Sequence, residues 1–157
     1  MDATPSPARA QPLIGWRLLA LLYDFFPMLG IWFVVGIASL ALHRGETIRS
    51  NTLAGMVELA ALVAVTGLYA TTSWRRGGQT IGMKPWRLHV VAADGTPAAW
   101  SRLWLRYAVG VVSLLVAGAG FWWAWLDREG LTWHDRVSGT RLIRDRERDA
   151  LRTTQAG

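Results

Sequence analysis

Two charged residues in the first apolar stretch of this sequence are the first candidates for chemistry. Arg17 and Asp24 are seven residues apart, so in a helix they share one face, about 10 Å apart along the axis. A charge inside a membrane helix is costly and needs a partner or a function. We expect Asp24 to be neutralised by Arg17, Arg106 or a bound cation, or else to keep its proton. Its role is then either a structural ion pair or an ion- or proton-carrying group.

Glu58 lies near the start of the second apolar stretch, about one helical turn in. A side chain at this depth reaches the membrane surface by snorkelling, which requires no function. If Glu58 faces Asp24 instead, two acids in one bundle indicate a cation or proton path.

The densest polar group in the chain is at residues 133–136 and includes His134 and Asp135. A histidine beside an acid is typical of zinc ligands and general bases. No second cluster has metal-ligand spacing, and no nucleophile motif is present. We therefore expect this group to cap a helix and to form ion pairs that dock the C-terminal tail. We expect neither an enzyme nor a bound metal or cofactor.

Residues 77–82 form a glycine-rich loop that contains Gly78, Gln79, Thr80 and Gly82. The loop lacks the Lys-Ser/Thr ending of a nucleotide-binding P-loop, and no helix clearly follows it. We interpret it as a tight turn where the chain leaves the second helix.

The elements that carry these residues are long and apolar. Hydrophobic residues make up 52% of the 157 residues, and charged residues 18%. Residues 18–42 and 52–74 contain one charge each, and residues 107–126 contain none. Because about 20 apolar residues cross a bilayer core, we expect helices over about 14–42, 53–74 and 103–126. The sequence predicts an all-α membrane protein, built on an antiparallel transmembrane helix hairpin. Tryptophans near the segment ends are typical of membrane boundaries: Trp16, Trp74, Trp100, Trp104 and Trp125.

The third segment has two interpretations. It either spans the membrane or forms two short helices that meet at residues 118–120 and re-enter on the same side. Gly118 and Gly120 favour the second form, as do the seven arginines that follow Leu126, because basic segments tend to stay in the cytoplasm.

Residues 1–12, with three prolines, are expected to be a disordered tail, and a cleaved signal peptide is not expected. Residues 13–143 form the membrane domain, and residues 144–157 form a charged tail. Residues 86–91 are β-branched and aromatic, and a turn signal follows at 93–96, so a short β-hairpin is expected in this loop. Residues 141–152 alternate in charge and are expected to form a solvated helix.

The distribution of charge predicts the orientation and the partners. Residues 75–106 hold six basic residues and one acid, which places this loop and the N-terminus in the cytoplasm. The net charge of +6 comes from basic residues that flank apolar spans, so we expect anionic lipid headgroups, not nucleic acid, as the charged partner. The chain has no cysteine and therefore no disulfide.

Five pieces of the sequence, in this order, resemble the RDD family of small bacterial membrane proteins. They are residues 17–24, 78–84, 87–91 with 94–95, 106–107 and 134–140. The resemblance covers about residues 15–143. It implies that Arg17, Asp24 and Asp135 are the arginine and two aspartates that name the family. It also implies about three helices in the bacterial cytoplasmic (inner) membrane. One departure is Met83 before Lys84, where many members place lysine directly after the glycine.

Two hypotheses follow. In the first, the chain is an accessory or structural membrane component in which Arg17, Asp24, Arg106 and Asp135 form one charge network. In the second, it is a homo-oligomeric cation/proton transporter that uses Asp24, as the resemblance implies for some members. Three spans at most are too few to enclose a route within one chain, so the transporter hypothesis requires a homo-oligomer. The accessory hypothesis requires a partner in the membrane. We therefore expect a homo-oligomer or another membrane protein as partner.

Overall fold

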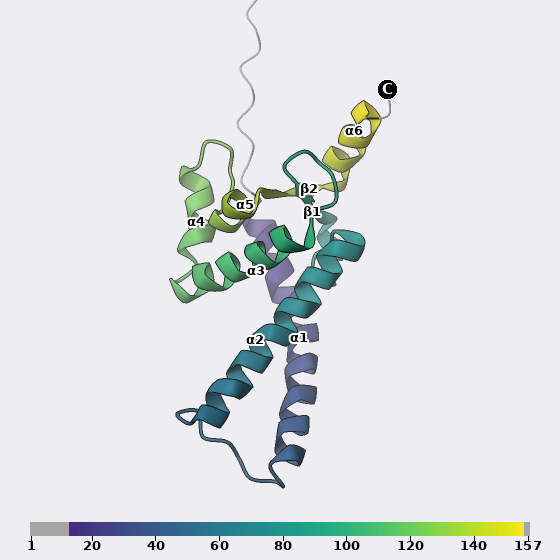
Figure 1. The fold of residues 1–157 in the computed structure, drawn as a ribbon. Coiled ribbons are helices and arrows are strands. Elements are labelled where there is room, and N and C mark those ends of the chain that lie inside the picture. The colour runs from purple at the N-terminus through teal and green to yellow at the C-terminus, as the bar shows by residue number, and fades with distance from the viewer. Residues whose placement is uncertain (1–12, 156–157) are drawn as a thin grey trace, which may run out of the picture.

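The computed structural model describes residues 13–155, without the side chains at 150–152 and 154–155. Two long helices form a hairpin, and all the other elements lie at one end of it (Figure 1). The expected tail at residues 1–12 lies outside the described residues. The elements are α1 (Ile14–Leu42), α2 (Leu53–Gly77), the 3₁₀ turn η1 (Lys84–Trp86), β1 (Leu88–Ala92), α3 (Trp100–Leu115), α4 (Ala119–Leu126), α5 (Trp133–Ser138), β2 (Thr140–Arg144) and α6 (Asp145–Gln155).

The two long helices form the expected antiparallel hairpin. Both are long and apolar enough to cross a membrane. The 29 residues of α1 extend for about 43 Å, which exceeds a hydrocarbon core of about 30 Å. Thr52 caps the start of α2 by accepting a hydrogen bond from the Gly55 amide, and Gly78 ends it with a left-handed φ of 72°. The predicted class of a mostly helical membrane protein with a transmembrane hairpin is confirmed.

The end of the hairpin that holds residues 43–52 is bare. There α1 and α2 diverge in Figure 1, and large apolar side chains such as Phe33 and Met56 are exposed. One hydrogen bond joins the helices in this half, from Trp32 Nε1 to Thr66 Oγ1 at 2.8 Å. In a membrane protein this apolar surface faces lipid or another helix.

The third apolar segment is two helices, not one. It begins at Trp100 and breaks after Leu115, and α3 and α4 are bent by 98° relative to each other. Ala117 and Gly118 both have positive φ, which ends one helix and redirects the next. The segment breaks beside Gly118, as the interpretation with two short helices requires, and the bend is that of either a broken span or a re-entrant pair. In Figure 1, α3 lies across α2.

The crossing of α3 over α2 requires a glycine. A Cβ atom at Gly67 would lie 2.6 Å from ring atoms of both Trp104 and Tyr107. The aromatic side chains of α3 thus rest directly on the backbone of α2, and the Tyr107 hydroxyl donates a hydrogen bond to the Val63 carbonyl at 2.7 Å.

The strand that we expected after η1 is present, but its partner is not within the same loop. β1 pairs antiparallel with β2, with Leu88 opposite Arg144 and Ala92 opposite Thr140. After the turn at Asp94–Thr96 the chain passes through Pro97 directly into α3, so no second loop strand can form. Residues 141–144, which we expected to be helical, supply the partner strand instead, and the tail helix begins at Asp145.

The hydrophobic core lies where β1, α3 and the start of α1 meet. Its buried members are Ala20, Met83, Leu88, Val90, Ala92, Ala98 and Leu103. Trp16, Trp74 and Trp86 pack around it. This core fixes the N-terminal turns of α1 against α3 and the sheet, and so positions the charged residues described next.

Candidate functional site

Three buried charged side chains from three helices meet at one point. Arg17 of α1 donates from Nη2 to Asp135 Oδ2 at 2.6 Å, and Arg106 of α3 donates from Nη1 to Asp135 Oδ1. The three residues are between 1% and 6% exposed. The Arg17–Asp135–Arg106 triad, as we name it, joins α1, α3 and the short helix α5. The sequence predicted that these three residues interact.

Two threonines complete the hydrogen bonds of the triad, one to the carboxylate and one to Arg106. The hydroxyl and backbone amide of Thr132 donate to Asp135 Oδ2 at 2.7 and 3.2 Å. Arg106 Nη1 donates to the hydroxyl of Thr140 at 2.8 Å. Sequence reasoning missed both threonines. A signal existed for Thr132, because a threonine followed three residues later by an acid is the spacing of a capping box.

The electrostatics of the triad favour a permanently charged Asp135. Burial raises the pKa of this carboxyl, but Arg17 and Arg106 lower it more strongly, and the resulting pKa is well below the ordinary 3.8. Two guanidiniums share one carboxylate, so the triad keeps a net positive charge. Removing one member of such a buried group leaves an uncompensated charge and typically costs about 3–5 kcal/mol.

His134 lies beside the triad as a neutral ring. Its Nε2 accepts a hydrogen bond from Arg17 Nη1 at 3.3 Å, and its ring lies 4.9 Å from that of Phe121. Burial and the nearby Arg106 lower the pKa of His134 well below 6.5. Because Nε2 is the acceptor, the proton is on Nδ1. Within residues 13–155, no three His, Cys, Asp or Glu side chains come together as a metal site would require.

Asp24 forms a second polar centre. Its Oδ1 accepts hydrogen bonds from the Tyr69 hydroxyl and the Gly82 amide, both at 2.9 Å, and its Oδ2 accepts one from the Thr80 hydroxyl. The loop lies so close to α1 that a Cβ atom at Gly82 would be 2.5 Å from the Asp24 backbone nitrogen. Asp24 therefore anchors the glycine-rich loop to the first helix.

This arrangement corrects the predicted network of four charges. Asp24 contacts neither Arg17 nor Arg106, and its described partners are uncharged donors instead of a cation. Tyr69 carried no signal in the sequence, while Thr80 and Gly82 were assigned only to a turn. Glu58 is half-buried, and none of the ion pairs among the described residues includes it.

The other residues of the loop motif join the loop to the sheet. The carbonyl of Gly78 accepts a hydrogen bond from the Val90 amide at 2.7 Å. The Gln79 side chain lies 3.3 Å from His89 Nδ1. The glycine-rich loop thus contacts α1 on one side and β1 on the other.

Comparison with known families decides what kind of protein this is. The sequence profile of the RDD family matches residues 11–139. The chain belongs to the RDD family. Comparisons with curated proteins and with solved structures gave no match. Family membership and the two long apolar helices make this RDD protein a membrane protein. The matched range includes both the triad and the Asp24 centre, and β2 and α6 follow it.

Proposed function

We propose that this RDD protein is a multi-pass accessory protein of the bacterial cytoplasmic membrane, which binds a partner there and is neither an enzyme nor a transporter. The observation that carries the proposal is that hydrogen-bond donors of the chain itself already bind Asp24. Each of its oxygens already accepts a hydrogen bond from the chain itself.

An ion-carrying carboxylate needs free lone pairs and neighbouring oxygens that turn toward the ion. The Gly82 amide can only donate, so it cannot serve as a cation ligand. Asp135 is equally engaged, because two arginines and Thr132 bind its oxygens. These contacts support a structural role for both aspartates: Asp24 anchors the loop, and Asp135 docks the C-terminal segment.

The bare half of the hairpin supports the second part of the proposal. Phe33 and Val34 of α1 and Met56 and Val57 of α2 are among its exposed side chains. Nothing charged except Glu58 lies among the residues of this half of either helix. Such a surface suits association with lipid and with another transmembrane helix, from a second copy or from another membrane protein.

The test compares transport with folding. We expect purified wild-type protein in proteoliposomes to show no proton-coupled flux of Na⁺, K⁺ or Li⁺. We expect Asp24→Asn to lower the amount of monodisperse protein, with Glu58→Gln as the matched control that does not. A wild-type flux that Asp24→Asn abolishes, while leaving the amount of folded protein unchanged, would overturn the accessory role and support a transporter.

A further inference from the structure

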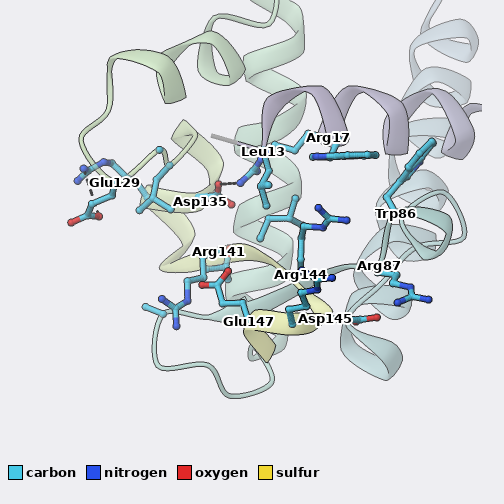
Figure 2. Close-up of a pocket in the computed structure, with 18 of the residues that line it drawn as sticks. Leu13, Arg17, Trp86, Arg87, Glu129, Asp135, Arg141, Arg144, Asp145 and Glu147 are labelled. Atoms are coloured by element: carbon cyan, nitrogen blue, oxygen red, sulfur yellow. Dashed lines mark hydrogen bonds and ion pairs between the residues drawn. The ribbon is translucent and has the colours of Figure 1, made fainter. Parts of the chain in front are cut away.

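A large cavity beside the triad has the composition of an anion site. Its volume is about 1560 Å³, above the range of about 300–1,000 Å³ usual for small-molecule pockets. The start of α1, η1, the α4–α5 loop, β2 and the start of α6 line it. Figure 2 shows Leu13 and Arg17 on one side, facing Arg141, Arg144 and Glu147 on the other.

The charge of the lining is strongly positive. Seven arginines and four acids line the cavity. Two of the acids already have partners, since Asp135 binds the lining residue Arg17 and also Arg106, and Asp145 lies 3.0 Å from His89. Five of the arginines form no ion pair with a residue that the structure describes: Arg87, Arg128, Arg141, Arg144 and Arg146. Such an excess attracts a multiply hydrogen-bonding anion.

Unpartnered donors in the lining are the second, independent observation. Arg17 Nε, Arg141 Nε and the indole Nε1 of Trp86 are buried and have no hydrogen-bond partner among the described residues. Arg17 itself is 6% exposed. A buried N–H without an acceptor is costly, so three donors around one cavity indicate an acceptor-rich ligand. Arginine forks match phosphate oxygens in particular.

An aromatic wall connects the cavity to the apolar surface of α1. The Arg144 guanidinium lies 5.0 Å from the ring centre of Trp16, and Trp16 lies 5.2 Å from Trp86. The ring centre of Trp86 in turn lies 5.5 Å from that of Tyr23, an exposed residue further along α1 than Trp16. A phosphate in the cavity would therefore have a continuous apolar path for attached acyl chains.

We propose that this cavity binds the phosphate headgroup of an anionic phospholipid, with Arg17, Arg141 and Arg144 as donors and the acyl chains along α1. The site shares Arg17 with the triad but does not include Asp24, and it stands whether or not the protein transports ions. The same phosphate chemistry is present in soluble phosphate esters, so the experiment must distinguish the two sources.

The experiment measures bound lipid on the full chain in detergent by native mass spectrometry. We expect phosphatidylglycerol to bind at least about tenfold more tightly than phosphatidylcholine, because only the first has a net charge to pair with arginine. We expect Arg141→Gln/Arg144→Gln to remove most of this preference. The matched control is Arg75→Gln/Arg76→Gln, which removes two exposed positive charges at the end of α2, outside the cavity.

Two further arms complete the test. Inorganic phosphate and glycerol 3-phosphate, added at millimolar concentration, are expected to compete only weakly. Equal losses in the two double variants, equal binding of the two lipids, or full displacement by glycerol 3-phosphate would each overturn the lipid site. If the cavity double variant is not monodisperse, Arg144→Gln alone makes the same comparison, since this side chain is exposed.

Discussion

At the scale of single residues, the strongest constraint is the shared carboxylate of Asp135. Asp135→Asn would leave two buried guanidiniums around a neutral amide. We expect a loss of about 3–5 kcal/mol in stability, seen as a lower unfolding temperature in detergent and less folded protein in the membrane. Asp94→Asn is the control, because Asp94 lies on an exposed turn. If both variants unfolded at the same temperature, the triad would not be a folding determinant.

His134 gives the triad a pH dependence. Arg17, Arg106 and Asp135 surround its ring, and burial keeps the folded-state pKa well below 6.5. The unfolded chain therefore takes up the proton first, and stability that is complete above about pH 6.5 is lost as the pH falls toward the folded-state pKa. The slope reaches at most about 1.4 kcal/mol per pH unit.

The measurement is the unfolding temperature in detergent at pH 7.5, 6.5 and 5.5. We expect His134→Gln to flatten the decrease between pH 6.5 and 5.5, while His43→Gln, at the exposed end of α1, leaves it unchanged. A decrease of equal size in all three proteins would assign the titration to another group.

The sequence could predict one of the two polar centres and not the other. Arg17, Arg106 and Asp135 are charged residues near apolar segments, and opposite charges in such places must meet. Asp24 was assigned the wrong kind of partner because the hydroxyls of Tyr69 and Thr80 and the amide of Gly82 carry no charge. Every residue except proline has an amide, so only the folded loop reveals which one binds a carboxylate.

At the scale of elements, the close approach of the glycine-rich loop to α1 is the feature to test. A Cβ atom at Gly82 would lie 2.5 Å from the Asp24 backbone nitrogen and 2.7 Å from its Cγ. We expect Gly82→Ala to lift the loop and to cost about 1–3 kcal/mol, as overpacking does. Gly77→Ala, where a Cβ meets nothing within 4 Å, is the matched control. We expect Gly82→Ala to unfold at a lower temperature than Gly77→Ala. Equal unfolding temperatures would contradict close packing of the loop against α1.

Hydropathy and glycine placement predicted most of the helices, but the pairing of the two strands could be seen only in the folded structure. Each long helix needs only a run of apolar residues, and the break after Leu115 follows from Gly118 nearby. β1 was predicted from its β-branched residues. Its partner lies in the basic tail, where alternating charge favoured a helix. Pairing between distant segments depends on α3 and α4 bringing the tail back, which no local pattern records.

At the scale of the whole molecule, the β1–β2 pairing constrains how the chain sits in a membrane. β1 precedes the α3–α4 pair and β2 follows it, yet their backbones are hydrogen-bonded in register. Two strands can pair only on the same side of a bilayer. The triad places the start of α1 on the same side of the bilayer, because Asp135 of the C-terminal segment binds Arg17. A 98° bend between α3 and α4 fits a re-entrant pair, which enters and leaves by one face.

Labelling of single cysteines tests this topology directly, because the chain has none of its own. Arg44→Cys lies at the bare end of the hairpin, Asp94→Cys on the turn after β1, and Asp149→Cys on α6, all at exposed positions. In intact bacterial cells we expect a membrane-impermeant maleimide to modify only Arg44→Cys. After permeabilisation, Asp94→Cys and Asp149→Cys should react together. If Asp149→Cys reacted from outside with Arg44→Cys, the third segment would cross fully, and the sheet and the triad could not form in the membrane.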